Sequence, residues 1–142
     1  MIVKKVIFVL IILLTVFFLY AGKRKKTETL PLLNTKWILK EIYETPVIQN
    51  QDTAFIIFFD SYKFSGNLGC NIFFGEFNYG KKRIRLDYLG SSKQYCFNMD
   101  LEEQFSKVLR SEITNYYIER NKLYFLDKNK TVCKFEAFAS SN

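Results

Sequence analysis

The chain has 142 residues, a formal net charge of +7 and no histidine. Without histidine it lacks the usual base for a serine or cysteine nucleophile and the usual zinc ligand, so we expect neither an enzyme nor a metal protein. Residues 1–26 hold six basic and no acidic side chains, whereas residues 27–142 carry 15 basic and 14 acidic ones. Because the larger part is nearly neutral, it offers no basic face for nucleic acid.

The chain begins with a hydrophobic segment between two basic clusters. Val6 to Gly22 contains seventeen residues without a charge, after Lys4-Lys5 and before Lys23 to Lys26. As a helix it would span about 25 Å, near the lower limit for a membrane span, and basic stems at both ends can make up the difference. Cleavage after Ala21 or one residue later would put a leucine or a tyrosine where signal peptidase needs a small residue. We therefore expect residues 1–26 to be an uncleaved signal-anchor, with a cleaved signal and secretion as the alternative.

Features of the sequence make opposite predictions about the side of the membrane on which the domain lies. Four basic residues follow the span and two precede it, which favours a cytoplasmic domain by the positive-inside rule. The short amino-terminal tail and the signal-like layout favour the outer side, where we expect the domain. Basic residues beside the anchor can also attract anionic lipid headgroups.

The remainder of the chain has the size of one domain. Residues 27–32 are expected to form a linker, residues 33–138 the domain and residues 139–142 a tail. Such a domain is long enough to bury a core. We expect a monomer.

Short apolar runs separated by turn residues predict a mainly β, antiparallel barrel or sandwich. Alternation is cleanest where Ile84, Leu86 and Tyr88 face inward. The basic run Lys81 to Arg83 is expected in a solvated hairpin turn after Gly80. The expected strands are Trp37–Tyr43, Ala54–Phe59, Tyr62–Leu68, Ile72–Tyr79, Arg83–Tyr88, Asn115–Glu119, Lys122–Leu126 and Thr131–Phe138.

One segment, residues 100–113, has the period of a helix. Leu101, Phe105, Val108 and Leu109 share one face, which predicts an amphipathic helix across an open end or face of the barrel. Its first turn contains Asp100, Glu102 and Glu103, which capping and the helix dipole explain better than acid–base catalysis does. The expected core comprises Phe105, Val108 and Leu109 together with Trp37, Phe59, Phe77, Leu86 and Phe135.

A short signature begins within the third expected strand and extends into the fourth. Ser65-Gly66 precedes Gly69-Cys70-Asn71, and Gly75 and Phe77 come next. With Trp37 in an opening run from Leu33 to Leu39, this pattern resembles the META domain, the family of the heat-shock-associated protein HslJ. Two family glycines are replaced, one by Asn34 and one by Arg120.

The resemblance implies an antiparallel, lipocalin-like β-barrel of about eight strands with one helix, often found in bacterial envelope proteins. It implies no cofactor and no established catalytic residue. The glycines either cradle a ligand or, as we prefer, permit positive φ, a bulge or close strand contact. Asn71 is expected to bind local backbone, and Trp37 to fill the core rather than line a pocket. The structural signature is Trp37, Ser65, Gly66, Gly69, Cys70, Asn71 and Gly75.

The family positions also imply a disulfide between Cys70 and Cys96, given an oxidising compartment. The alternative is two buried thiols. Cys133 is expected to be a buried thiol on the last strand.

Two functions remain open. The first is a non-catalytic, membrane-anchored envelope protein with a structural or stress-related role. The alternative is a binding barrel that holds an apolar small molecule or inhibits a protein partner. The fifteen phenylalanines and nine tyrosines favour the first, because so many large rings tend to fill an eight-stranded interior.

Overall fold

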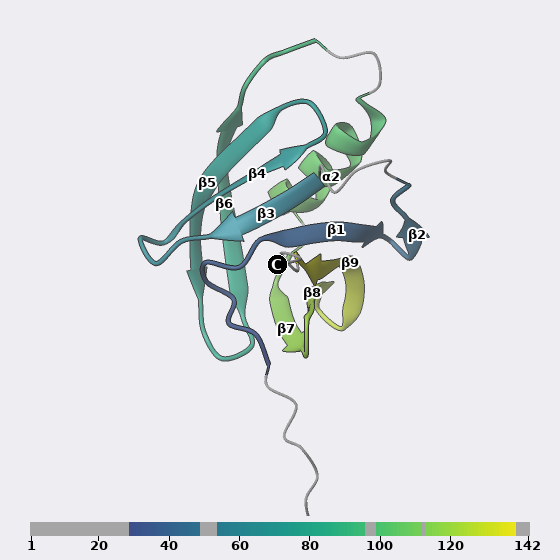
Figure 1. The fold of residues 1–142 in the computed structure, drawn as a ribbon. Helices are drawn as coiled ribbons and strands as arrows, with labels where there is room; N and C mark the ends of the chain where they lie inside the picture. Colours follow the sequence, from purple (N-terminus) through teal and green to yellow (C-terminus); the bar gives the residue numbers. More distant parts are fainter. Residues whose placement is uncertain (1–28, 49–53, 96–98, 112, 139–142) are drawn as a thin grey trace, which may run out of the picture.

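A computed structural model describes residues 29–48, 54–95, 99–111 and 113–138. They form one antiparallel sheet in the order β6-β5-β4-β3-β1-β9-β8-β7, with the two-residue β2 beside β1 (Figure 1). The strands are β1 Trp37–Ile42, β2 Thr45–Pro46, β3 Ala54–Phe58, β4 Lys63–Leu68, β5 Ile72–Tyr79, β6 Ile84–Ser91, β7 Asn115–Glu119, β8 Lys122–Asp127 and β9 Lys130–Ala137.

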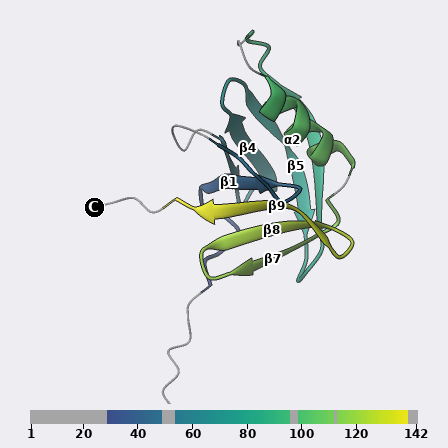
Figure 2. The same cartoon turned by 90° about the vertical axis from the view of Figure 1, so that its right-hand side faces the viewer.

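The sheet rolls into a half-barrel. Figure 2 shows β1, β9, β8 and β7 as adjacent strands, one below the other, with β4 and β5 curving up behind them. The two outer strands, β6 and β7, meet only where an isolated bridge joins Arg83 to Asn115. The mainly β antiparallel class is therefore confirmed, whereas the expected barrel is open along this seam.

Most strands follow the predicted alternation. In β3, Ala54, Ile56 and Phe58 are buried while the residues between them are half-buried. The prediction that Phe59 belongs to the core is wrong, because this side chain is 37% exposed and lies one residue past the strand end. The run from Ala54 to Phe59 is apolar at every position, so its pattern does not show which face points inward.

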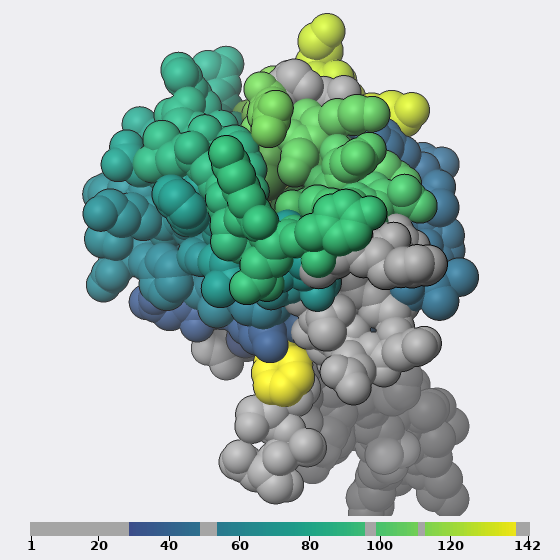
Figure 3. All heavy atoms as spheres, turned by 90° about the horizontal axis from the view of Figure 1, so that it is seen from above, coloured from purple at the N-terminus to yellow at the C-terminus, as the bar shows by residue number. Residues whose placement is uncertain are grey.

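The predicted helix is confirmed as α2, Asp100–Ser111. The helix residues Phe105, Val108 and Leu109 are buried. Figure 1 places α2 over one end of the half-barrel. In the space-filling view of that end, its green side chains lie among the teal ones of the neighbouring strands (Figure 3). α2 thus covers an open end, as the apolar stripe predicts.

A circuit of phenylalanine rings fills the interior. Each ring contacts the next at centroid distances of 5.1 to 6.1 Å, within the range of favourable aromatic pairs. The six rings, in order, are Phe58, Phe64, Phe73, Phe105, Phe135 and Phe125. Trp37, Phe77, Leu86 and Phe135 are buried as predicted.

The expected anchor, residues 1–26, lies outside the described residues. Within the described ranges, no helix is long and apolar enough to span a bilayer.

Candidate functional site

The signature glycines lie where strands β4 and β5 pack on each other's rings. Gly66 pairs with Phe73, and Gly75 pairs with Phe64. A Cβ on either glycine would collide with the partner's ring and with a backbone carbonyl oxygen. The register of β5 against β6 shifts between Phe74 and Gly75, which marks a bulge. These two glycines therefore serve strand contact, the preferred interpretation of the sequence, and not a ligand cradle.

Gly69 has a different role, because it has a φ of +110° in the turn between β4 and β5. Its backbone N–H donates to Oδ1 of Asn67 at 2.5 Å. Positive φ is accessible to glycine at little cost. Next to this turn, the hydroxyl of Ser65 donates to the carbonyl oxygen of Phe73, which adds a side-chain tie between the two strands.

Asn71 is the centre of a buried polar network. Its side-chain oxygen accepts hydrogen bonds from the Ser92 hydroxyl and the Gln94 backbone N–H, both at 2.8 Å. Its amide nitrogen donates to the Gln94 carbonyl at 3.1 Å and to Oε2 of Glu102 at 3.0 Å. Asn71 is only 1% exposed. The prediction that Asn71 binds local backbone is therefore wrong in range. Its side chain bonds to residues more than twenty positions away in the sequence.

Glu102 connects this network to α2. Its 9% exposure makes it one of two buried polar residues in the described part of the chain. Sequence reasoning assigned it to capping of the helix, and the carboxylate instead accepts from Asn71. Spacing along the helix could not reveal this contact, because the partner lies in a distant turn. All buried side-chain nitrogen and oxygen atoms of the described residues have hydrogen-bond partners, so the network is complete without a ligand.

Trp37 is a core residue, as predicted. It is fully buried, and its indole N–H donates to the Leu32 carbonyl at 3.1 Å. This bond fixes the start of the domain against β1, because a buried indole nitrogen needs a partner.

The predicted disulfide falls partly outside the described residues. The structure has Cys70 in a disulfide, and Cys96 is not described, so the pair Cys70–Cys96 stays a prediction. The Gln94 carbonyl, two residues before Cys96, lies 3.6 Å from the Cys70 sulfur. Cys133 is a buried thiol, as expected.

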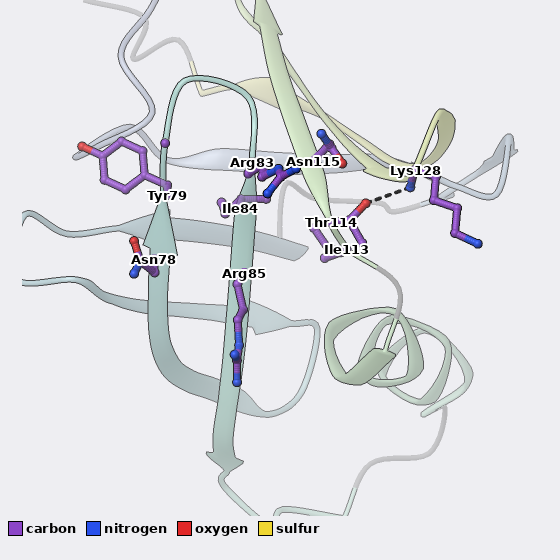
Figure 4. Close-up of a pocket in the computed structure, with 10 residues that line it drawn as sticks. Asn78, Tyr79, Arg83, Ile84, Arg85, Ile113, Thr114, Asn115 and Lys128 are labelled. Atoms are coloured by element: carbon purple, nitrogen blue, oxygen red, sulfur yellow. Dashed lines mark hydrogen bonds between the residues drawn. The ribbon is translucent and has the colours of Figure 1, made fainter.

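A cleft in the described residues opens at the seam between β6 and β7. This cleft has a volume of about 720 Å³, and three basic residues are among those that line it. Figure 4 shows Arg83 reaching toward Asn115 across the seam, Arg85 lying along β6 and Lys128 pointing away. The lining residues are Asn78, Tyr79, Gly80, Arg83, Ile84, Arg85, Ile113, Thr114, Asn115 and Lys128.

The charges of this cleft do not converge on one point. Arg85 forms an ion pair with Asp87 at 3.0 Å, and the Lys128 backbone N–H donates to the Thr114 hydroxyl at 2.8 Å while its side chain points outward. Catalysis requires groups aimed at one reacting atom, which this arrangement does not supply. Within the described ranges, no three His, Cys, Asp or Glu side chains gather as metal ligands would.

Comparison with known proteins identifies the family. The model of the META domain matches residues 30–139. The chain belongs to the META domain family. An NMR structure from Burkholderia xenovorans is 16% identical, with a TM-score of 0.61 over 84% of this chain and 99% of that one. A second NMR structure is 21% identical, with a TM-score of 0.57 over 72% and 87%. Both show likeness of fold alone. A search of curated proteins gave no match.

Two positions where this chain departs from the META family pattern have a left-handed backbone. Asn34 and Arg120, which replace usual glycines, have φ values of +58° and +57°. Glycine takes this left-handed conformation readily and asparagine tolerates it, whereas arginine does so at a cost. The family's preference for glycine there thus has a backbone cause in this chain.

Proposed function

We propose that this META protein is a non-catalytic, membrane-anchored module of the cell envelope, with its domain on the outer side of the membrane and a structural or stress-related role. The observation that carries the non-catalytic part is the filled interior: six phenylalanine rings form a closed circuit where a ligand-binding barrel would be hollow. The signature residues are used in strand contacts and in a complete polar network.

The anchoring part is supported by the seventeen uncharged residues from Val6 to Gly22 and by the poor cleavage site at their end. Expression of the full chain, followed by alkaline carbonate extraction of membranes, tests it. We expect the protein to stay in the pellet with its amino terminus intact. A soluble product that starts near Lys23 would establish a cleaved signal instead.

A matched variant strengthens this test. A charge at the centre of a span costs roughly 2.5–3.5 kcal/mol in insertion, so Leu13→Arg should move the protein toward the supernatant. Leu13→Ile should leave it in the pellet. Equal extraction of both variants would contradict the anchor.

The second candidate function is ligand binding, which the 720 Å³ cleft favours because its volume lies within the range of small-molecule sites. Apolar Ile84 and Ile113 beside Arg83 suit a small anion with an apolar ring. Titration of the detergent-solubilised chain with 1-naphthalenesulfonate tests this, with empty micelles as the blank. Saturable binding that Arg83→Ala weakens at least tenfold, and Arg110→Ala does not, would support it. Equal binding by both variants would reject it.

A further inference from the structure

The hairpin between β5 and β6 ends in a tight basic tip. The Gly80 N–H donates to the Arg83 carbonyl at 2.9 Å, which pairs the two residues that flank Lys81 and Lys82. Lys81 and Lys82 are exposed, as is Arg83. The sequence predicted this solvated turn, but not what lies next to it.

β7 holds the tip in place. The Tyr116 N–H donates to the Lys82 carbonyl at 2.9 Å, and the Tyr116 hydroxyl donates to the Gly80 carbonyl at 3.0 Å. A tyrosine hydroxyl is protonated at neutral pH, and burial, followed by the neighbouring Tyr79, raises the pKa of Tyr116 further above its usual 10.0. The tip is therefore a fixed feature of the surface.

The chain leaves the domain toward its amino terminus at the same end. The Leu30 N–H donates to the Arg120 carbonyl at 3.1 Å in the turn after β7. Because β7 runs antiparallel to β6 from the Arg83–Asn115 bridge, its far end lies on the tip side of the molecule. Figure 1 shows the descending chain, the β5–β6 hairpin and β7 together at the lower end. We call Lys81, Lys82, Arg83 and Arg120 the basic end.

The basic end is available for a partner. Its four residues are exposed, and within the described ranges none of them forms a salt bridge. The acidic neighbours are Glu119, the last residue of β7, and Glu136, which accepts a hydrogen bond from Asn121 beside Arg120. Two acidic against four basic side chains leave a net positive charge. Exposed basic clusters close to a bilayer are attracted by anionic headgroups over about a Debye length.

We infer that the basic end docks on anionic phospholipid headgroups and so orients the META domain with its β5–β6 hairpin toward the membrane. The inference rests on the proposed anchor. Only seven residues separate Gly22 from Leu30, and they can span at most about 25 Å. With Leu30 bonded to Arg120, the basic end must stay near the headgroups, whereas α2 lies at the far end of the domain.

Lysine reactivity of the full chain tests the orientation. The protein is inserted into vesicles of phosphatidylcholine alone or with 30% phosphatidylglycerol, and flotation first establishes that it is membrane-bound. A membrane-impermeant amine reagent is then added, and modification of each lysine is followed by mass spectrometry. We expect Lys81 and Lys82 to react about fivefold more slowly with phosphatidylglycerol present, and this protection to disappear at 0.5 M salt.

Lys93 and Lys107, at the α2 end, are the internal controls and should react equally in both vesicles. Equal reaction of Lys81 and Lys82 in floating vesicles of both kinds would overturn the docking but leave the anchor intact. Failure to float would overturn the anchor and, with it, this inference. Lys81→Gln/Lys82→Gln should abolish the salt-dependent protection of Lys122, which follows the Arg120 turn at the start of β8. Lys93→Gln/Lys107→Gln should preserve the protection of Lys81 and Lys82. Protection that survives the first pair of changes would contradict the assignment.

Discussion

The backbone of Arg120 has a conformation that its side chain disfavours. A left-handed φ of +57° costs an L-residue with a Cβ roughly 1–2 kcal/mol, part of which the greater freedom of unfolded glycine offsets. We therefore expect Arg120→Gly to stabilise the domain by about 1 kcal/mol in urea unfolding. Arg120→Ala, which keeps the Cβ, should bring little gain. Equal stabilisation by both variants would locate the effect in the charge rather than in the backbone.

Gly66 illustrates the opposite case. A Cβ there would meet the Phe55 carbonyl oxygen and the Phe73 ring, and crowding of a packed core typically costs 1–3 kcal/mol. Gly66→Ala should therefore lower the free energy of unfolding by about 2–3 kcal/mol. Gly80→Ala is the matched control, because nothing lies within 4 Å of its added methyl group. A neutral Gly66→Ala would show that the strands separate more easily than their packing indicates.

The residue scale is also where prediction from sequence has its clearest limits. Alternation located Ile84 and Leu86 correctly, because polar residues separate them. It failed at Phe59, where an unbroken apolar run hides the phase of the strand. The contact from Glu102 to Asn71 was missed because no local pattern specifies a partner in a distant turn. The cleft likewise depends on how β6 and β7 meet.

At the scale of elements, the Asn71–Glu102 bond joins α2 to the β4–β5 turn. Removal of the asparagine would leave buried partners unsatisfied, at a cost of about 1–3 kcal/mol for each. We expect Asn71→Ala to destabilise the fold by about 3 kcal/mol and Glu102→Ala by about 2 kcal/mol, with Asn78→Ala nearly neutral because Asn78 is exposed.

A double-mutant cycle separates this contact from general loss of packing. If the bond couples the helix to the turn, the combined Asn71→Ala/Glu102→Ala variant should lose at least 1 kcal/mol less than the two single losses together. Strict additivity would mean that the two residues act independently.

At the scale of the whole molecule, the oxidation state of the cysteines depends on the compartment in which the domain lies. In an oxidising compartment, Cys70 should bridge Cys96, which would stabilise the domain by about 3–4 kcal/mol in the chain-entropy model. Alkylation of the unfolded protein without reductant, followed by intact-mass analysis, should then label one cysteine, Cys133. Three labels would reject the bridge.

The positions of most strands and of the helix along the chain were predictable because turn signals separate the apolar runs, whereas the order of the strands in the sheet was not predicted. The opening between β6 and β7 was not predictable, since closure of a barrel depends on strand tilt and stagger over the whole sheet. The two-residue β2 was missed for a simpler reason: Pro46 is typical of a strand end and not of a strand.

The central claim, an anchored META domain outside the membrane, is tested most directly by protease access. The full chain is produced in a bacterium, and protease is added to intact spheroplasts and to lysed ones. Since the domain is expected outside, digestion should remove it in intact spheroplasts and leave a membrane fragment that begins at Met1. A domain that stays protected until the cells are lysed would contradict the claim.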